Sequence, residues 1–565
     1  SPDNPLIFAA NPFSGIGVAG SSKFTVACKS PLTGFIGDSL SSGSLAEELK
    51  RMPFDALVVT GKADTLTSLV VVDQEVRFRS ADHLTGLSAS EVERHIKRDL
   101  GDSELQVAAI GPAGEAGVRY ACITNEGRQA GRTGAGAVMG SKNVKAIAFK
   151  GINPCPVAHP KELKAVAARL REASRGQATA KYRGPGTIAN LSTLNRLSAL
   201  PSFNFRLSTF ENADRIGAEA LGKHRVRDRD GESASRDWEH VFGTRGSRGS
   251  RVRSRVEYES LFALGPLCGV DDPNVIIRAA ALCDSVGIDT ISTGGTIAWA
   301  MESFEKGLIT RSDTGGLELR FGNGTALLSA IEKIGRREGI GDLLAEGTKR
   351  ASAAVGGGSD AWAMQVKGLE MPGYDPRALK TLALGLAVNA RGACHNRSLA
   401  YDIDMANLGE VTEAEQGTGI LAAASEDMAA VLDSLVLSKF LRRCFADFYP
   451  EAAHIYELVT GWEMSGEELR RVGERINNLR KTFNIREGWK KGDDILPPRI
   501  FAEAPASDDP TQADLTRAEL KAMVGNYYRA RGWTRDGLIP RGKLGELGLW
   551  HLVETSSSAA PARKK

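Results

Sequence analysis

The segment at residues 130–143, AGRTGAGAVMGSKN, constrains this chain more than any other. Four of the ten residues from 131 to 140 are glycines. Because glycine has no Cβ, such a backbone can bring its N–H groups close to a ligand, and Arg132 and Lys142 add positive charge. The apolar run at residues 146–149 is typical of a buried strand. The lysine of a phosphate-binding P-loop is not in place, so the segment alone predicts either a ligand-binding loop or a tight structural turn.

Further glycine-rich turns precede this segment and separate short apolar stretches. They lie at residues 11–24, 29–39 and 110–115. The composition agrees with many tight turns, since 62 of the 565 residues are glycine, well above average usage. Alternation along the apolar stretches, such as residues 56–60 and 68–72, is imperfect, which is expected of strands covered on both faces.

In this order of motifs the chain resembles the aldehyde:ferredoxin oxidoreductase family, enzymes that carry tungsten or molybdenum on two pterin dithiolenes. The resemblance rests on the turns above, on GIDTIS at residues 287–292 and on LEMP at residues 369–372. It runs to about residue 550. A bis-pterin cofactor brings phosphates and many ring N–H and C=O groups into a dry cleft. Scattered glycine turns suit such a ligand better than they suit a nucleotide.

The resemblance implies an α+β fold. A β-rich pterin-binding domain is expected at residues 1–157, with two sheets that form a saddle under the cofactor. Two mainly α-helical domains follow at residues 158–365 and 366–554, and the polar tail at residues 555–565 is expected to be disordered. The family's first strands would precede Ser1, so the chain is expected to be short at its N-terminus.

Local patterns predict several helices after residue 157. Pro160 stands in the first turn of an apolar stripe with helical spacing. Asp272 and Gly287 bracket a second apolar segment as N-cap and terminal glycine. Ser465 and Glu468 form a capping box. The buried seam of the helix that follows is expected at Leu469, Val472, Ile476, Leu479 and Phe483.

The resemblance assigns cofactor contacts near the glycine-rich turns. Lys23 stands where the family has a basic residue beside a pterin phosphate. Leu40 and Ala130 stand where backbone carbonyls hold a magnesium ion that bridges the two pterins. Gly131 and Arg132 belong to the glycine-rich segment itself. Leu40 replaces the family's usual asparagine, which is tolerable if only its carbonyl is used.

The family's acidic pattern Asp-x-x-Gly-x-Asp/Cys occurs once per pterin. The first copy is intact, with Asp284, Gly287 and Asp289. The second begins at Asp433, but Val436 and Ser438 replace its glycine and cysteine. A carboxylate suits the guanidine-like edge of a pterin because it accepts two parallel N–H bonds. Asp433 alternatively serves only as a helix cap.

The candidate catalytic residues are a histidine and two glutamates. His395 lies in RGACHNR at residues 391–397, and the resemblance implies that it hydrogen-bonds the substrate carbonyl. Glu259 is expected to be the general base, with a pKa raised in a dry pocket, and Glu257 is the fallback. A structural role is the ordinary explanation of a lone histidine, and two glutamates flanking a tyrosine are also typical of a solvated face.

Family members hold a [4Fe–4S] cluster with Cys-x-x-Cys-x-x-x-Cys and a distant fourth cysteine. The triplet is expected at residues 228–242, but no cysteine occurs between Cys155 and Cys268, and the fourth position is Ser438. Serine rarely replaces even one such ligand, so we expect no cluster. Electrons would then leave to a partner's centre, or the chain binds its cofactor without turnover, or residues 225–255 are a sequence artefact. Ser438 lies far outside that stretch and argues against an artefact alone.

The stretch at residues 225–255 is rich in arginine, glycine and serine. Such a composition predicts a solvated, mobile loop. A nucleic-acid patch would need aromatic residues among the basic ones, and only Trp238 and Phe242 lie near. The net charge of +3 indicates neither nucleic acid nor an acidic membrane surface as a partner.

The expected activity is a tungsten- or molybdenum-pterin oxidoreductase that interconverts aldehydes and carboxylic acids. Ferredoxin or another electron-transfer subunit would be the partner, and a homo-oligomer is compatible with the resemblance. A subunit that reduces a ring or enoyl thioester, and a cofactor-binding homologue without chemistry, are the alternatives. No apolar run approaches 18 residues, so no membrane span is expected. The seven scattered cysteines are typical of reduced thiols, which favours the cytoplasm.

Overall fold

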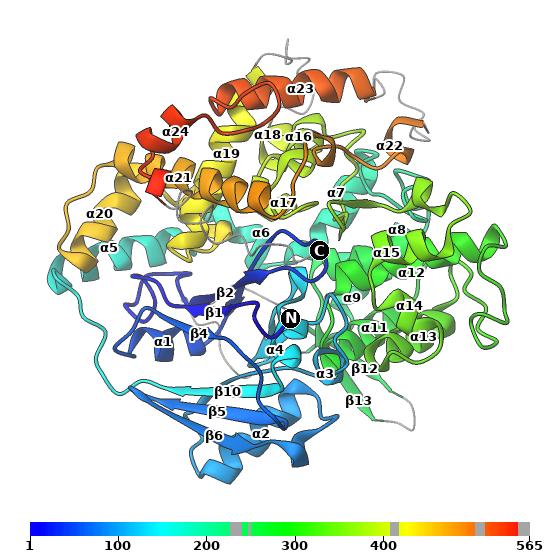
Figure 1. Ribbon diagram of the computed structural model, residues 1–565, viewed down its shortest axis with the longest axis horizontal. Helices are drawn as coiled ribbons and strands as arrows, with labels where there is room; N and C mark the ends of the chain where they lie inside the picture. Colours follow the sequence, from blue (N-terminus) through cyan, green and yellow to red (C-terminus); the bar gives the residue numbers. More distant parts are fainter. Residues whose placement is uncertain (227–239, 247–249, 407–416, 503–514, 552–565) are drawn as a thin grey trace, which may run out of the picture.

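The computed structural model describes residues 1–226, 240–246, 250–406, 417–502 and 515–551. A β-rich N-terminal part is followed by a mainly helical remainder (Figure 1), which confirms the predicted α+β class. The domain boundaries after residues 157 and 365 stay predictions, and the tail at 555–565 lies outside the described residues. Within the described ranges, no helix combines the length and apolar character that crossing a bilayer requires.

Two sheets make up the N-terminal part. The first is antiparallel in the order β3-β2-β1-β4 and consists of β1 (Leu6–Ala9), β2 (Lys23–Lys29), β3 (Ile36–Ser42) and β4 (Ala56–Val59). The second, in the order β6-β5-β10-β7-β8-β9, consists of β5 (Thr67–Val72), β6 (Glu75–Ser80), β7 (Gln106–Ala109), β8 (Ile123–Asn125), β9 (Arg128–Ala130) and β10 (Val144–Lys150). Strands β5 and β10 run parallel, and the other neighbours are antiparallel.

The two sheets share one core, to which α1 (Leu45–Lys50) and α4 (Ala135–Ser141) also contribute. Ile147 and Phe149 of β10 face this core, whereas Ala146 and Ala148 face α2 (Ala89–Leu100) on the other side. Strand β10 is therefore covered on both faces, as its apolar run predicts. The same expectation is wrong for β4, an edge strand in which no side chain is fully buried.

The glycine-rich segment passes from β9 into α4. Gly134 has a left-handed φ of 82°, and a Cβ there would lie 1.9 Å from the carbonyl oxygen of Arg119. A Cβ on Gly136 would lie 2.3 Å from the carbonyl oxygen of Cys122. These two glycines are therefore needed for the close packing of backbone on backbone. The predicted structural turn is real, and it occurs in the segment that also contributes Gly131 to the site.

The helices of the middle of the chain pack beside the sheets. They are α3 (Pro112–Glu115), α5 (Pro160–Ala173), α6 (Ala180–Arg183), α7 (Asn190–Arg196), α8 (Ala213–Ile216), α9 (Ala218–Gly222), α10 (Tyr258–Leu264), α11 (Pro273–Val286), α12 (Thr290–Glu305), α13 (Gly324–Arg336), α14 (Ile340–Leu344) and α15 (Thr348–Val355). A short pair of strands, β14 (Gln365–Val366) and β15 (Leu369–Glu370), follows them.

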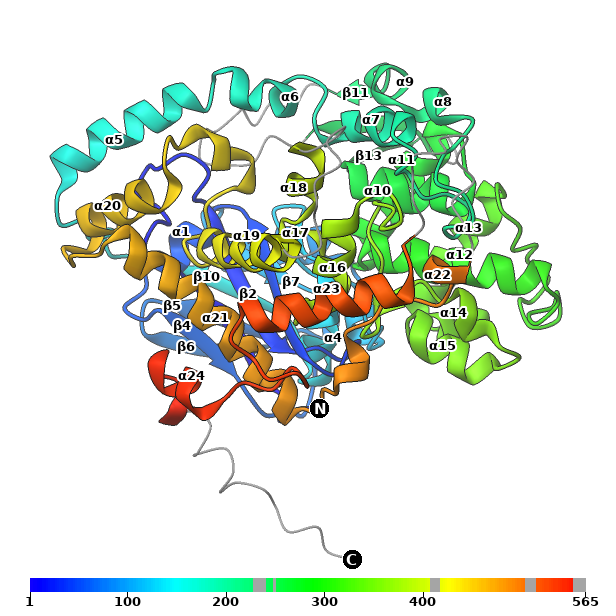
Figure 2. The same ribbon diagram turned by 90° about the horizontal axis from the view of Figure 1, so that it is seen from above.

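The last part of the chain completes the helical layer. It contains α16 (Lys380–Val388), α17 (His395–Ser398), α18 (Tyr401–Ala406), α19 (Gly417–Ser434), the 3₁₀ helix η8 (Lys439–Cys444), α20 (Phe448–Thr460), α21 (Gly466–Arg486), α22 (Arg499–Ala502), α23 (Arg517–Ala530) and α24 (Arg541–Glu546). Helices α5 and α20 pack together on one side of the sheets, and α11 to α13 lie on the other (Figure 2).

The predicted helix signals are confirmed. Pro160 begins α5, Asp272 caps α11 through the N–H of Asn274, and Gly287 ends α11 with a φ of 83°. The capping box of Ser465 and Glu468 begins α21.

The predicted apolar seam of α21 is only partly confirmed, because Leu469 is buried, Val472, Ile476 and Phe483 are half-buried, and Leu479 is exposed. The helix buries Leu469, Gly473, Asn477, Asn478, Lys481 and Asn484, while the side chain of Leu479 is 42% exposed. The inward face is polar because it meets polar groups. Asn477 donates to Asp427 of α19, and Asn484 accepts from the N–H of Ile36 in β3.

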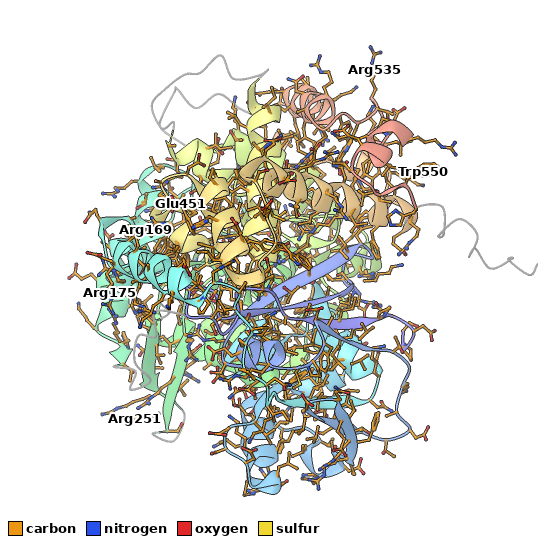
Figure 3. All side chains as sticks on the ribbon, turned by 90° about the vertical axis from the view of Figure 1, so that its left-hand side faces the viewer. Arg169, Arg175, Arg251, Glu451, Arg535 and Trp550 are labelled. Atoms are coloured by element: carbon orange, nitrogen blue, oxygen red, sulfur yellow. The ribbon has the colours of Figure 1, made fainter. Side chains whose placement is uncertain are left out.

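The described residues of the arginine-rich stretch form a sheet, so the prediction of a mobile loop is wrong for them. Strands β11 (Arg225–Val226), β12 (Val241–Arg245) and β13 (Arg251–Arg255) pair in that order. Ser254 is buried and donates to Asp284 of α11, whereas Arg251 and Arg253 are exposed. Figure 3 shows Arg251 at the periphery of the molecule. Residues 227–239 and 247–249 lie outside the described residues.

Candidate functional site

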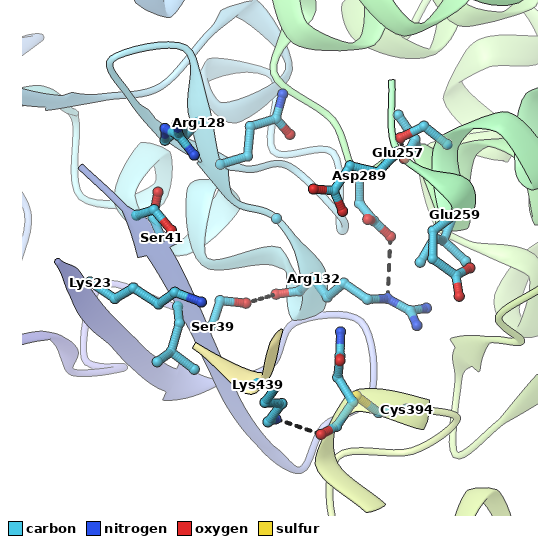
Figure 4. Close-up of a pocket in the computed structure, with 18 of the residues that line it drawn as sticks. Lys23, Ser39, Ser41, Arg128, Arg132, Glu257, Glu259, Asp289, Cys394 and Lys439 are labelled. Atoms are coloured by element: carbon cyan, nitrogen blue, oxygen red, sulfur yellow. Dashed lines mark hydrogen bonds and ion pairs between the residues drawn. The ribbon is translucent and has the colours of Figure 1, made fainter. Parts of the chain in front are cut away.

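A cavity of about 370 Å³ lies where the N-terminal sheets meet the helical part (Figure 4). Its walls come from β2 and β3, the segment around β9, and the starts of α10, α12, α17 and η8. The predicted residues that line it are Lys23, Leu40, Gly131, Arg132, Glu257, Glu259, Asp284, Asp289, His395, Asp433 and Ser438. The fold therefore brings together side chains that lie more than 400 residues apart in the sequence.

Two predicted cofactor residues, Ala130 and Gly287, are not among the described residues that line the cavity. Ala130 pairs with Ile123 between β8 and β9, and the carbonyl of Gly287 accepts the N–H of Cys122. Ala130 stands between the lining residues Gln129 and Gly131, and Gly287 lies two residues before Asp289. Their contact with a cofactor stays a prediction.

The carboxylates of the intact acidic pattern are both held in place. Asp289 caps α12 by accepting the N–H of Ser292 at 2.9 Å, and its Oδ2 lies 3.4 Å from Nε of Arg132. Asp284 accepts from Nε2 of Gln129 at 2.6 Å and from Oγ of Ser254 at 2.8 Å. A carboxylate has about four acceptor positions, so such a group can bind protein donors and a ligand at the same time.

Arg132 is fixed by two carbonyls from distant parts of the chain. Its Nη1 donates to Ala393 at 3.0 Å and its Nη2 donates to Glu370 at 2.7 Å. Figure 4 shows its guanidinium extending from the glycine-rich segment towards Asp289. The arginine thus ties this segment to β15 and to the backbone just before His395.

A buried network of ion pairs forms another wall. Arg397 pairs with Asp433 at 2.6 Å and with Asp38 of β3 at 3.1 Å, and Lys439 pairs with Asp433 at 2.9 Å. Although burial opposes ionisation, Arg397 and Lys439 hold the pKa of Asp433 below its ordinary value. Asp433 is the next-to-last residue of α19, so the alternative that it is a helix N-cap is wrong.

Sequence reasoning did not assign Arg391, Cys394, Arg397 or Lys439, all of which line the cavity. The sequence did contain a signal for three of these residues, since two arginines and a cysteine surround His395 within residues 391–397. Although burial disfavours a thiolate, Arg391, Arg397 and Arg132 lower the pKa of Cys394. The wall of the cavity that contains Arg391, Arg397 and Lys439 is therefore strongly cationic.

His395 and Glu259 meet at one end of the cavity. Nδ1 of His395 lies 3.4 Å from Oε1 of Glu259, and Oε2 of Glu259 accepts the N–H of Gly373 at 3.0 Å. Burial raises the pKa of Glu259 to about 7. Burial, with the charges of Arg132 and other nearby cations, lowers the pKa of His395 well below its ordinary value. The histidine is therefore neutral.

The alternative that these glutamates form a solvated face is wrong for Glu259, whose side chain is only 18% exposed. Glu257 is half-buried, precedes α10 at its N-cap position and lines the same cavity. The geometry brings Glu259 rather than Glu257 to His395.

Comparison with known proteins identifies the family. Residues 1–151 match the description "Aldehyde ferredoxin oxidoreductase, N-terminal domain", and residues 162–549 match "Aldehyde ferredoxin oxidoreductase, domains 2 & 3". The chain belongs to the aldehyde ferredoxin oxidoreductase family. This confirms the resemblance drawn from the order of the glycine turns and of the GIDTIS and LEMP segments.

Relatives of this family cover most of the chain. The tungsten-containing aldehyde ferredoxin oxidoreductase of Pyrococcus furiosus is 38% identical over 565 residues, or 97% of this chain and 91% of the relative. The WOR-like subunit of an aliphatic sulfonate oxidoreductase from the same organism is 26% identical over 97% of this chain and 88% of its own length. The BamBC active-site complex of benzoyl coenzyme A reductase with 1,5-dienoyl-CoA has a TM-score of 0.80, with 23% identity over 100% of this chain and 92% of that chain. At that identity the structure shows a shared fold alone.

The family's metal-pterin cofactor fits the residues that are present. Nε of Arg391, Nε of Arg397 and Oγ of Ser41 are buried at the cavity without a hydrogen-bond partner among the described residues. Buried polar groups ordinarily have such a partner. Phosphates and ring carbonyls would accept from these donors, and the pterin N–H groups would reach the carboxylates of Asp284 and Asp433.

Ser438, where the resemblance places the fourth cluster cysteine, also lies at this cavity. Ser438 is buried and caps η8 by accepting the N–H of Phe440. Among the described residues, no group of three or more histidine, cysteine, aspartate or glutamate side chains is arranged to hold a metal ion. Most of the window expected for the other three cysteines, residues 228–239, lies outside the described residues.

The raised pKa of Glu259 is directly measurable. Infrared difference spectra between the wild type and Glu259→Gln should contain a protonated carboxyl band that disappears as the pH rises through about 7. The pKa of Glu259 is raised rather than lowered because burial favours the neutral acid over the carboxylate. Asp342→Asn, at an exposed carboxylate, is the control. Loss of the Glu259 band near pH 4.5, the ordinary value, would contradict this environment.

Proposed function

We propose that this chain is a tungsten- or molybdenum-pterin oxidoreductase that interconverts an aldehyde and a carboxylic acid. The observation that carries the proposal is the pairing of neutral His395 with Glu259 at the edge of a cationic cavity suited to a pterin cofactor. Membership of the family and the similarity to tungsten-containing aldehyde ferredoxin oxidoreductases support it.

The residues proposed to hold the cofactor come from both halves of the chain. Lys23 and the cations Arg397 and Lys439 would bind phosphates, because charge-assisted hydrogen bonds are the strongest available there. Asp284, Asp289 and Asp433 would accept pterin N–H groups. The carbonyls of Leu40 and Ala130 would bind magnesium, which prefers oxygen ligands. When bound, the metal-pterin group supplies the two-electron redox chemistry.

The protein's own part in the reaction is to polarise a carbonyl and to accept a proton. The neutral ring of His395 carries one N–H, which donates to the carbonyl oxygen of the aldehyde. Oxidation of a hydrated aldehyde to the acid releases two electrons and two protons. The carboxylate of Glu259 would take one of these protons, and the other would leave to solvent. A base with a pKa near the working pH is both sufficiently ionised and sufficiently strong for this task. Glu257 stays the fallback base.

The role of His395 is tested with aldehydes and an artificial dye as electron acceptor. His395→Ala should lower the rate by something on the order of 10²-fold, the usual effect of losing a carbonyl-polarising or acid–base group. Metal content should be unchanged, because His395 is not among the proposed cofactor ligands. His454→Ala, at an exposed histidine of α20, is the matched control.

Full activity of His395→Ala would show that His395 does not polarise the substrate carbonyl. Metal-loaded wild type that oxidises no aldehyde would favour the rivals, a subunit that reduces a ring or enoyl thioester or a homologue without chemistry.

We also propose that the chain holds no iron–sulfur cluster and passes its electrons to a ferredoxin or a partner subunit. Ser438 replaces one ligand, and the interval between Cys155 and Cys268 contains no cysteine. Thiolates are the ordinary ligands of such clusters. All seven cysteines are free thiols, in keeping with the proposed location in the reducing cytoplasm.

Iron and acid-labile sulfide measured on anaerobically purified protein test this directly. The expected result is neither element in stoichiometric amount. About four irons per chain, the content of one [4Fe–4S] cluster, would contradict the proposal.

A further inference from the structure

A second cavity, of about 610 Å³, adjoins the cofactor cavity at the catalytic pair. The residues that line both cavities are Glu257, Glu259, His395, Asn396 and Phe440. A molecule in the second cavity therefore reaches His395 and Glu259, and the glycine-rich segment contributes no residue to the lining of this cavity. If the proposed function holds, this cavity is where the aldehyde lies.

The middle of the second cavity is aromatic. Tyr374 lies 5.1 Å from the ring of His395 and 5.4 Å from that of Tyr401, and Tyr258 lies 5.5 Å from Tyr374, measured between ring centroids. Tyr182 of α6 stacks on Phe440 at 4.2 Å. Such walls exclude water and pack against a flat or apolar body.

The outer end of the cavity is cationic. Lys181 of α6 and Arg442 and Arg443 of η8 line it, and Lys181 and Arg443 are exposed. Their charges are close enough to interact, because burial and then Arg442 and Arg443 lower the pKa of Lys181. Asp402 accepts hydrogen bonds from Nε and Nη2 of Arg442, at 2.5 and 2.6 Å.

This arrangement leaves an excess of positive charge at the mouth. Of the acids among the described lining residues, Glu257 and Glu259 lie at the shared inner end and Asp402 is engaged by Arg442. At the mouth, the three cations Lys181, Arg442 and Arg443 are therefore opposed by one carboxylate among the described lining residues, that of Asp402. These charges would add no favourable binding free energy for an uncharged, apolar aldehyde.

We propose that the substrate is an aldehyde with an aromatic or apolar body and an anionic group, a carboxylate or a phosphate ester, at the end remote from its carbonyl. The carbonyl lies at His395 and Glu259, the body lies between the tyrosines, and the anion binds Lys181 and Arg443. This inference rests on the proposed function, and it makes Lys181 and Arg443 determinants of specificity.

The test compares benzaldehyde with 4-formylbenzoate and 4-formylphenyl phosphate, using the metal-loaded full chain and a dye acceptor. Both anionic substrates should have a KM about tenfold lower than benzaldehyde with a similar kcat, since two partly exposed charge pairs together contribute about that factor. Preference for one of the two anions identifies the group. The double variant Lys181→Gln/Arg443→Gln should lose the preference and keep its rate with benzaldehyde. Lys164→Gln, at an exposed lysine of α5, is the control.

Calorimetry separates a failure of this inference from a failure of the proposed function. Terephthalate, the product of 4-formylbenzoate, should bind about tenfold more tightly than benzoate, and the double variant should abolish the difference. Equal binding and equal KM values for charged and neutral compounds in a protein that oxidises benzaldehyde would overturn the inference alone. Charge-dependent binding without oxidation of any aldehyde would uphold the cationic subsite and overturn the activity.

Discussion

The ion pairs of Arg397 connect the two halves of this molecule. Arg397 of α17 binds Asp38 of β3 and Asp433 of α19, and Arg480 of α21 reaches the same Asp38 at 2.9 Å. All four charges lie at the contact between the first sheet and the helices. A buried charge that loses its partner costs about 3–5 kcal/mol, so the network strongly favours one relative position of the sheet and the helices. The cofactor cavity exists only in that position, because its walls come from both sides.

The site uses burial in two opposite ways. Around Asp38 and Asp433, several cations outweigh the cost of burial and keep the carboxylates ionised. At Glu259 burial prevails, because one backbone N–H and the more distant Arg132 are the opposing influences. One cleft can therefore present fixed charges to an anionic cofactor and, a short distance away, a carboxyl group poised to exchange a proton near neutral pH.

The sequence was most informative where local chemistry decides the structure. The helix caps at Asp272 and Ser465 and the buried strand β10 follow from capping and hydrophobic periodicity, and they are confirmed. The α+β class and the family followed from the order of the glycine turns. The seam of α21 was predicted only in part, because its fully buried face carries asparagines that bond to other elements, which periodicity cannot reveal.

The site was only partly predictable for the same reason. Asp284 and Asp289 stand in a recognisable pattern, but Arg391 and Arg397 acquire their importance from Asp38, a partner distant in sequence. The aromatic and cationic cavity beside His395 likewise combines α6, α10, α18 and η8. No local signal marks Lys181 as part of it.

The central claim is that this cavity holds a metal-pterin cofactor, and the most direct test is the elemental and pterin content of the purified chain. Protein expressed with tungstate and molybdate both available should carry one of the two metals in stoichiometric amount, together with pterin released on acid oxidation. A protein that is folded by circular dichroism but free of both metals and of pterin would contradict the account.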